Sequence, residues 1–497
     1  MNKDIKLIKR APIITVAGHI DHGKTTFLNF ISKTKNPQKE YGGITQHIKS
    51  YYINTPFGAM TFLDTPGHFA FNSNRENCIK VSDIVLLIIS IDDGIKPQTI
   101  ESINLAKKFN IPIFVAINKI DKIENFVEKE EHILKDLLTY ELTAEKWGGN
   151  LTVSLISSKT GVGVNDLLEL LSFQADLLDL KVDNLSDHYG IILENKLDIG
   201  KGNVATIILK NGELKKGSII KVNNTISKIK TIYDVNDNII DFVYPSLPVN
   251  VTGLHFNLEI GEKFEIILDK GIKIKNVLQS SNLNKSADIY NVDSLLYDMK
   301  KNLNTKINLI IKVDVQGSIK VLKSLLEGLS TETVKIVIIK IDIGNFNESD
   351  LDLGSITNSL LIGFNVKVDS KIIKMAASNS LSIYNFNVIY DIIDFLKDRI
   401  KNQIILDLKT NLLGNAEIKK IFKHKDSVIA GCFVINGKIK QNSNIKIKRQ
   451  ELVVYEGVLD SIKVFKVNVK EVKSGTECGI IIKKYNKFLV GDIIEAY

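Results

Sequence analysis

The sequence is poor in cysteine and has no apolar run long enough to span a bilayer. Its three cysteines, Cys78, Cys432 and Cys478, are odd in number and show no Cys-x-x-Cys spacing. We therefore expect a reducing compartment and no structural zinc. Met1 to Arg10 also lacks the apolar core of a signal peptide. These absences predict a cytoplasmic protein without a membrane partner, from a bacterium or from a plastid or other organelle of bacterial descent.

Arginine is also scarce, although the chain is basic. Arg10, Arg75, Arg399 and Arg449 are the only arginines, which we attribute to a coding genome biased towards A and T. The net charge of +8 over 497 residues is compatible with RNA contact but too dilute to argue for it. A chain of this length is expected to form three or four domains, at about 150 residues each.

One stretch carries the clearest chemical signal. It follows an apolar run, precedes an expected helix that begins at Thr26, and reads Gly18-His19-Ile20-Asp21-His22-Gly23-Lys24-Thr25. This is the G-x-x-x-x-G-K-[ST] pattern of a phosphate-binding loop, in the strand–loop–helix setting that the pattern requires. The glycines let backbone N–H groups face phosphate oxygens, and the helix N-terminus adds partial positive charge. We expect Lys24 to reach the β- and γ-phosphates and the Thr25 hydroxyl to bind Mg²⁺.

Two further segments are expected to complete a triphosphate site. The glycine-led segment 42–47 contains Thr45 and is typical of a loop that closes over a γ-phosphate, although it is also a common turn. A later strand runs into the sequence Asp64-Thr65-Pro66-Gly67-His68. At a strand's carboxyl end, Asp64 can hold the metal through water, and the Gly67 N–H can bind the γ-phosphate. We expect His68 beside the reacting phosphate; the alternative is a solvated surface histidine.

The next buried strand is followed by a base-recognition motif, Asn118-Lys119-Ile120-Asp121. The Asp121 carboxylate can accept from both N1–H and N2–H₂ of guanine, which adenine does not offer. The Asn118 amide can contact the O6/N7 edge, and the Lys119 stem can lie over the ring. Another strand ends in a turn expected to cover the same base, Ser157-Ser158-Lys159. Four of the eight histidines fall inside the motifs described so far, which a purely structural interpretation does not explain: His19, His22, His47 and His68.

Together these motifs resemble those of the translational GTPases, and most closely bacterial translation initiation factor two. The resemblance covers nearly the whole chain and includes the runs Ile44-Thr45-Gln46-His47-Ile48, Asp64 to Phe71, Asp92 to Thr99 and Trp147-Gly148-Gly149. It implies that Thr25 and Thr45 bind Mg²⁺ directly and that Asp64 does so through water. It further implies that GTP and GDP are the nucleotides, and that His68 positions the attacking water once the ribosome has ordered it.

The remaining chain predicts a multidomain α/β and β fold. Two patterns recur in the same order: Asn211 to Ile220 matches Asn436 to Ile445, and Ile260 to Phe264 matches Val490 to Ile494, which indicates two barrels of one type. Val313 to Ser318 looks like a motif, but a helix start with a glycine hinge explains it equally well. The expected parts are a P-loop GTPase domain (8–182), a β-barrel (189–270), a helical linker (271–306), an α/β domain (307–387), a linking helix (388–408) and a second β-barrel (409–497).

For the last barrel the resemblance implies a pocket for the formylmethionyl end of initiator tRNA, formed by Cys432, Glu477 and Cys478. Two cysteines buried in a barrel core are the alternative, which the residues alone favour. Val464 stands where the family typically has arginine, which puts one tRNA contact in doubt. We also expect the auxiliary ribosome contacts of a long amino-terminal extension to be missing.

The resulting expectation is a GTPase that brings formylmethionyl initiator tRNA to the small ribosomal subunit and promotes joining of the large one. Other initiation factors are expected partners, and the chain should be monomeric off the ribosome. An elongation-type factor delivering aminoacyl-tRNA is a second candidate, against which the α/β insert and second barrel argue. The third is a GTP-dependent ribosome-binding or assembly protein without a tRNA cargo.

Overall fold

The computed structural model describes residues 7–33, 45–67, 69–123, 126–183, 187–198, 200–223, 225–254, 258–267, 305–331, 333–410, 412–424, 427–450, 452–465, 467–482 and 485–497. Three predicted features therefore lie outside the described residues: His68, the glycines that begin the segment 42–47, and nearly all of the expected helical linker. The chain divides into two compact units, Met1–Asp394 and Phe395–Tyr497. No helix in the described ranges is long and apolar enough to cross a membrane.

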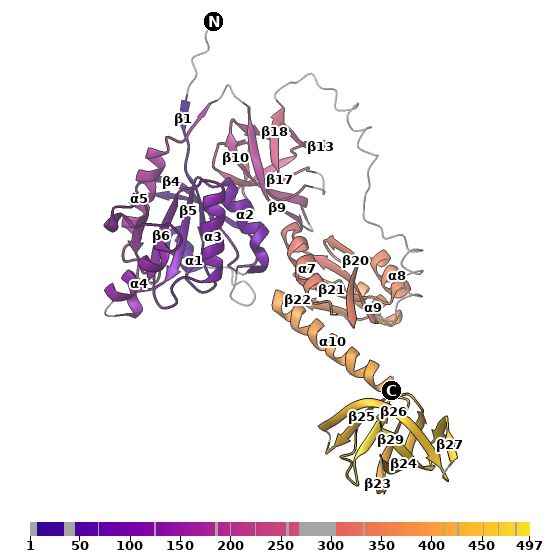
Figure 1. The fold of residues 1–497 in the computed structure, drawn as a ribbon. Coiled ribbons are helices and arrows are strands. Elements are labelled where there is room, and N and C mark those ends of the chain that lie inside the picture. Colours follow the sequence, from indigo (N-terminus) through magenta and orange to yellow (C-terminus); the bar gives the residue numbers. More distant parts are fainter. Residues whose placement is uncertain are drawn as a thin grey trace. The chain divides into compact units, whose positions relative to one another are not determined.

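The first unit begins with a six-stranded sheet that is parallel except for its edge strand β3 (Figure 1). The continuous apolar sequences of its central strands are those of a sheet buried on both faces. In spatial order the strands are β3 (Lys49–Thr55), β4 (Gly58–Asp64), β2 (Ile13–Ala17), β5 (Ile84–Ser90), β6 (Ile113–Asn118) and β7 (Thr152–Leu155).

Helices cover both faces of this sheet. On one face, α1 (Lys24–Ser32) and α5 (Val164–Leu177) pack against the strands through residues such as Phe27, Leu28 and Leu167. The opposite layer contains residues of α2 (Asn72–Val81), α3 (Pro97–Lys108) and α4 (Val127–Leu138). Except for the segment with Thr45, which precedes β3, the predicted nucleotide motifs follow the carboxyl ends of β2, β4, β6 and β7, where ligands bind in open α/β sheets. Short elements complete the domain: β1 (Leu7–Lys9), β8 (Lys181–Asp183), η2 (Phe69–Phe71), η3 (Ile120–Lys122) and η4 (Glu145–Trp147).

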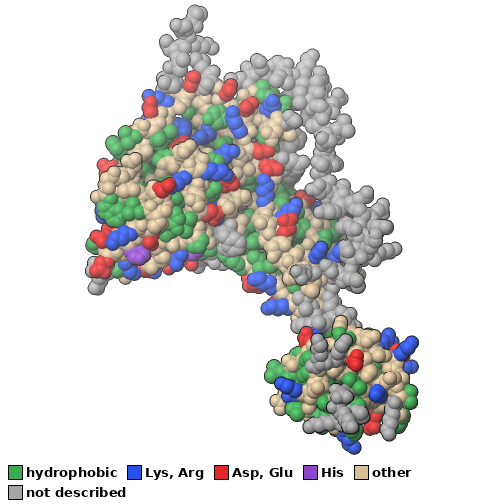
Figure 2. Space-filling view, viewed as in Figure 1, with side chains coloured by type: hydrophobic (Ala, Val, Ile, Leu, Met, Phe, Trp, Pro, Cys, Tyr) green, Lys and Arg blue, Asp and Glu red, His purple; other side chains and the backbone are tan. Residues whose placement is uncertain are grey.

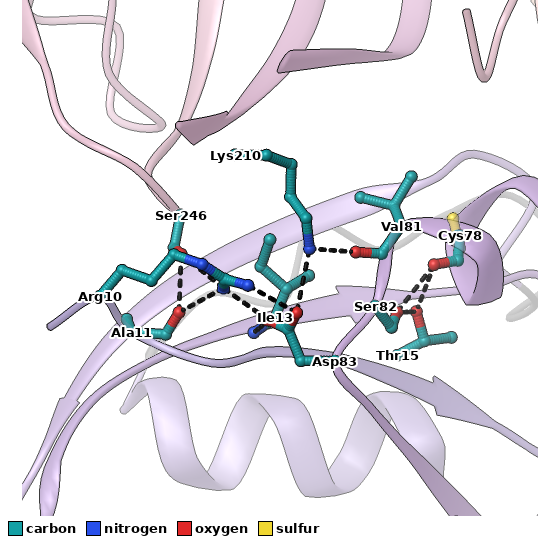
Figure 3. Close-up of polar contacts among 10 residues, drawn as sticks. All are labelled: Arg10, Ala11, Ile13, Thr15, Cys78, Val81, Ser82, Asp83, Lys210 and Ser246. Atoms are coloured by element: carbon teal, nitrogen blue, oxygen red, sulfur yellow. Dashed lines mark hydrogen bonds and ion pairs between the residues drawn. The ribbon is translucent and has the colours of Figure 1, made fainter. Parts of the chain in front are cut away.

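A buried ion-pair cluster joins the opposite end of this domain to the barrel that follows (Figure 3). Arg10 donates from both terminal nitrogens to the Asp83 carboxylate, at 2.6 and 2.7 Å, and Lys210 donates to it at 3.0 Å. Burial by itself raises the pKa of Asp83, but the Arg10 hydrogen bond and the charges of Lys210 and Arg10 hold it below its ordinary value. Ser246 of the barrel also donates to the Ala11 carbonyl, at 2.6 Å. This contact lies before the strands begin, away from the nucleotide motifs.

The first barrel is an antiparallel sheet around one apolar core. Its strands in spatial order are β13 (Thr225–Lys228), β12 (Ile219–Val222), β18 (Lys263–Ile267), β9 (Tyr189–Asp198), β10 (Gly202–Asn211), β17 (Pro248–Thr252), β14 (Thr231–Tyr233) and β15 (Ile239–Ile240), with β11 (Leu214–Lys215) paired to β16 (Phe242–Val243).

The α/β region has a four-stranded parallel sheet in the order β20 (Val334–Ile343), β19 (Thr305–Val313), β21 (Leu360–Phe364), β22 (Ile383–Phe386). Its helices are α7 (Gln316–Gly328), α8 (Glu348–Thr357) and α9 (Ser370–Ser378). From the sequence alone, Ser349 or Asp350 is expected to cap α8, and this expectation is wrong. Asn347 is the cap, because its side chain accepts from the Asp350 N–H while Asp350 accepts from the Asn347 N–H.

The linking helix α10 (Ile389–Thr410) is longer than the expected 388–408, and the boundary between the two units falls within it. The second unit continues as a barrel that closes on itself, because β23 pairs with both β30 and β24. Its strands are β23 (Gly414–His424), β24 (Ser427–Lys440), β25 (Asn444–Arg449), β26 (Leu452–Val464), β27 (Val467–Val469), β28 (Glu471–Lys473), β29 (Glu477–Ile482) and β30 (Ile493–Ala496).

The predicted likeness of the two barrels is confirmed by their pairing. In the first, β18 pairs with both β9 and β12; in the second, β30 pairs with both β23 and β25. The repeated glycines adopt the same conformation: φ is +85° at Gly212 and Gly261, +71° at Gly437 and +94° at Gly491. Figure 2 shows positive and negative side chains interspersed over the visible face, as the dilute net charge predicts.

Candidate nucleotide site

The loop between β2 and α1 has the backbone that its two glycines require. Gly18 and Gly23 have φ values of +142° and +93°. A Cβ atom would lie 2.3 Å from the Ile88 carbonyl oxygen at the first position, and 2.2 Å from Asn118 Nδ2 at the second. No side chain caps α1 at Gly23. A helix N-terminus without a side-chain cap is a favourable place for an anion.

Lys24 is the first residue of α1, and its amine lies close to the turn after β4 that contains Gly67. Its Nζ donates to the carbonyls of Gly18 (2.9 Å) and His19 (2.6 Å). A Cβ on Gly67 would be 2.7 Å from that nitrogen. Burial lowers the pKa of Lys24 to about 8, against the opposing effect of the Asp64 charge. The negative charge of a bound anion would offset the cost of keeping this ammonium group charged away from water, which fits a phosphate-binding role.

Three predicted metal ligands meet next to Lys24. Thr25 Oγ1 and Thr45 Oγ1 are 2.9 Å apart, and each lies 3.4 Å from Asp64 Oδ2. Two oxygens in adjacent positions around an octahedral Mg²⁺ at 2.0–2.1 Å would be about 2.9 Å apart. This spacing, which is also that of an ordinary hydrogen bond, would allow both hydroxyls to hold one Mg²⁺, with the Asp64 carboxylate beside them. This all-oxygen set fits Mg²⁺.

Asp64 and its turn are held by buried contacts. Thr65 donates to the Val16 carbonyl at 2.9 Å, which ties the end of β4 to the end of β2. Arg75, the arginine nearest to this turn in sequence, is fully buried. It donates to the Pro66 carbonyl at 3.0 Å and to Glu101 at 2.6 Å. Its guanidinium therefore supports the turn, and these bonds occupy both terminal nitrogens. Burial lowers the Arg75 pKa, which the Glu101 charge opposes.

The base-recognition motif is bonded to the phosphate loop. Asn118 donates to the His22 carbonyl at 2.9 Å and accepts from the N–H and hydroxyl of Ser158, at 2.9 and 3.0 Å. Ser157 donates to Asp121 at 2.6 Å, and this hydrogen bond lowers the Asp121 pKa. The carboxylate is exposed and ionised, as an acceptor for a base must be. The structure thus brings together the two motifs predicted to hold the base.

The other predicted nucleotide contacts lie around this framework. Lys119 adopts a left-handed backbone, with φ +68°. The exposed members are Asp21, Thr26 and Lys159, and the half-buried ones are Ile20 and Ile120.

The clustered histidines have structural partners that the sequence did not reveal. His22 is fully buried, and burial lowers its pKa to about 4, so it is neutral near pH 7. Its Nδ1 lies 3.3 Å from the Ile88 carbonyl oxygen. His19 contacts Gln98, and His47 lies beside Asp314 at 3.2 Å. Each of these three side chains therefore has a partner within the described part of the protein.

The predicted tRNA-end residues lie on adjacent strands of the second barrel. Cys432 and Cys478 are direct cross-strand partners in the apolar core, 2% and 5% exposed. Burial raises the pKa of Cys478 to about 11 and that of Cys432 well above its ordinary value, so both stay thiols. Glu477 is exposed and pairs with Phe433. The structure matches the core-cysteine alternative and leaves Glu477 as the accessible member.

Comparisons with known proteins cover the same regions. Residues 9–176 match the family model "Elongation factor Tu GTP binding domain", residues 187–266 match "Elongation factor G domain 2", and residues 281–397 match "Translation-initiation factor 2". A solved structure of GDP-bound aIF5B from Aeropyrum pernix is 22% identical and covers 98% of this chain and 92% of its own, with a TM-score of 0.46. That score is too low to support an argument.

Two curated relatives decide the family. "Translation initiation factor IF-2" from Buchnera aphidicola subsp. Schizaphis graminum is 41% identical over 99% of this chain and 57% of its own length. The factor of the same name from Geobacillus thermodenitrificans is 38% identical over 99% of this chain and 67% of its own length. The chain thus spans little more than half of the first relative. With its phosphate loop, base motif and barrels in the order described above, the chain belongs to the translation initiation factor IF-2 family.

Proposed function

We propose that this chain is a GTPase of translation initiation. It binds GTP with Mg²⁺, brings formylmethionyl initiator tRNA to the small ribosomal subunit, promotes subunit joining, and hydrolyses GTP on the ribosome. The observation that carries the proposal is the convergence of Lys24, Thr25, Thr45 and Asp64 at the carboxyl ends of β2 and β4. The family membership supports the translational role.

In this proposal each residue of the site has one task. Lys24 and the N–H groups of the loop neutralise the β- and γ-phosphates. Thr25 and Thr45 would hold Mg²⁺ directly, and Asp64 would hold it through water. The metal, when bound, offsets charge on the phosphate oxygens. Gly67 donates its N–H to the γ-phosphate, and His68 orients the attacking water.

The base assignment predicts the effect of Asp121→Asn. The amide presents a donor where the carboxylate accepted, so N2–H₂ of guanine loses its partner and xanthine becomes the preferred base. Loss of a charge-assisted contact with two hydrogen bonds should cost about 2–4 kcal/mol of GTP-binding free energy. Equilibrium titrations with GTP and XTP measure both changes.

Asp166→Asn is the matched control, since it removes an exposed carboxylate from α5 of the same domain. It should leave both affinities unchanged. Unaltered GTP affinity in Asp121→Asn would refute the guanine assignment.

The proposed tRNA binding is tested by comparing the affinities for formylated and unformylated initiator tRNA. We expect the full-length chain to bind formylmethionyl initiator tRNA more tightly than the unformylated methionyl form, and Glu477→Gln to reduce that difference. Filter binding with both tRNAs is the measurement. Equal binding of both forms would favour an elongation-type factor, and absence of tRNA binding would favour a ribosome-assembly GTPase.

A further inference from the structure

The segment after Thr45 contacts residues from distant parts of the first unit. Gln46 donates to the Asn387 carbonyl at 3.0 Å, after the end of β22. His47 Nε2 lies 3.2 Å from Asp314 Oδ2, after the end of β19, and 3.5 Å from Asn365 Nδ2, after the end of β21. Three parallel strands of the α/β region thus end against this segment. The carboxyl edge of such a sheet is the usual place for a ligand, and here residues 46 and 47 occupy it.

The barrel holds the same segment from another direction. Glu194 of β9 lies 3.9 Å from His47 Nδ1, and its carboxylate accepts from the Ile48 N–H. Glu194 is only 8% exposed and Gln46 only 3%. The contacts of Glu194 and Gln46 are therefore largely shielded from water, whereas the side chains of His47 and Asp314 are 23% and 26% exposed.

The barrel and the α/β region, which both contact this segment, also contact each other. Lys196 of β9 forms a β-bridge with Val315, and Asn195 donates to Gln316 at 3.2 Å. A Cβ on Gly317 would be 3.1 Å from Asn74 of α2, the helix that follows the Asp64 turn. The run from Val313 to Ser318, which resembled a motif without a task, is thus the meeting point of the barrel, the α/β region and α2.

We propose that Asp314 and Glu194 are positioning residues, which act through His47 and Ile48 to hold Thr45 in the metal site. Thr45 is two residues from His47, and consecutive Cα atoms are only 3.8 Å apart. Fixing residues 46–48 therefore restricts where the Thr45 hydroxyl can lie. In the structure His47 lies beside Asp314 while Thr45 Oγ1 lies 2.9 Å from Thr25 Oγ1, so the contact with Asp314 and the metal-site position of Thr45 occur together.

This inference rests on the proposed GTP and Mg²⁺ site and extends it by naming what stabilises it from outside the P-loop domain. Thr45 can bind the metal beside a γ-phosphate, which GDP lacks. Loss of the contacts that Asp314 and Glu194 make with residues 46–48, which we call the tether, should therefore weaken the binding of GTP but not that of GDP. A general loss of structure would weaken the binding of both nucleotides.

The test uses the full-length chain with Asp314→Asn and, separately, Glu194→Gln. Both substitutions keep the side-chain shape and replace the carboxyl group with an amide; burial raises the pKa of Glu194 to about 7, so the larger loss of charge is expected in Asp314→Asn. With Mg²⁺ present, the affinity for a fluorescent non-hydrolysable GTP analogue should fall by about 5- to 150-fold, the usual range for coupling between sites. The affinity for fluorescent GDP should change less than about twofold, well below that range. Amide hydrogen exchange over residues 45–55 should speed up in the analogue-bound protein.

Asp369→Asn is the matched control, because Asp369 is an exposed carboxylate in the loop after β21 of the same sheet. It should alter neither affinity nor exchange. Unchanged affinity and exchange in Asp314→Asn and Glu194→Gln would overturn the proposal, as would equal losses for GDP and the GTP analogue.

Thr45→Val separates this proposal from the one on which it rests. If Thr45 binds the metal, Thr45→Val weakens analogue binding, and adding Asp314→Asn causes no further loss. If Thr45→Val has no effect, the metal assignment fails; faster exchange over 45–55 in Asp314→Asn would still support the tether. Full additivity of the two substitutions would overturn the positioning role.

Discussion

Without ribosomes, the purified protein is expected to hydrolyse GTP very slowly. Ribosomes should accelerate hydrolysis by about 10³–10⁵-fold, which is the effect of adding a missing transition-state stabiliser such as an arginine finger. The slow rate is expected because the two arginines of the first domain are bonded to other groups of the protein. Arg10 is bonded to Asp83, and Arg75 is bonded to Pro66 and Glu101. Among the described residues at the site, Lys24 and backbone donors, together with Mg²⁺, would balance charge on the γ-phosphate. Single-turnover hydrolysis with and without ribosomes is the measurement.

The control is the double variant Arg75→Ala with Glu101→Gln. The second substitution is added because Arg75→Ala alone would leave the partly buried Glu101 carboxylate without its partner. Because Arg75 supports the turn after Asp64, the double variant should lose stability, while its slow ribosome-free rate stays within about threefold of wild type, far from the effect of a lost finger. Rapid ribosome-free hydrolysis that this variant abolishes would show that the protein provides its own arginine.

Replacement of His68 by alanine is expected to separate binding from catalysis. The residue follows Asp64-Thr65-Pro66-Gly67, so its side chain can lie near the attacking water without contacting the base or the α-phosphate. Lys24, Thr25 and the loop N–H groups should hold GTP as before. Ribosome-stimulated hydrolysis should fall by about 10²–10⁴, as expected when a group that orients water or transfers a proton is lost. GTP affinity and single-turnover hydrolysis on ribosomes measure the two effects.

His132→Ala is a suitable control, because that side chain is exposed on α4 and pairs only with Asp136 among the contacts described for it. It should change neither quantity. Hydrolysis by His68→Ala within about threefold of wild type, far short of the loss expected for a catalytic group, would exclude a catalytic role. A collapse of GTP affinity would instead indicate a structural role. A pH–rate profile distinguishes a general base from a water-orienting donor.

The fold could be predicted where local patterns are strong. The buried strand at 84–90 and the strand Leu360–Phe364 follow from continuous apolar runs, and the likeness of the barrels follows from repeated glycine turns. Prediction failed where the deciding contact is specific. The helix α8 begins at an Asn347–Asp350 capping box rather than at Ser349 or Asp350, because the pattern does not show which of these neighbouring polar side chains accepts the helix N–H. The linking helix α10 agrees with the expected 388–408 to within two residues at each end.

The nucleotide motifs were determined by the sequence itself. Each is a short run that combines a strand end with a turn, and parallel strands bring their carboxyl ends to one edge. The spacing of Gly18, Gly23, Lys24 and Thr25 therefore implies a phosphate loop before any tertiary contact is known. The Asn118 to Asp121 run specifies its base through side-chain chemistry in the same way.

Only the tertiary structure decided the roles of residues whose partners are remote in sequence. Arg75 is a support for the Asp64 turn because Glu101 and Pro66 surround it, and Cys432 and Cys478 are core residues because their strands pair. Gln46 meets Asn387 across 341 positions. A local sequence pattern records backbone conformation and burial, but it does not record which distant charge will neutralise a buried one. That choice is made when separately formed sheets pack together and every buried polar group must find a partner.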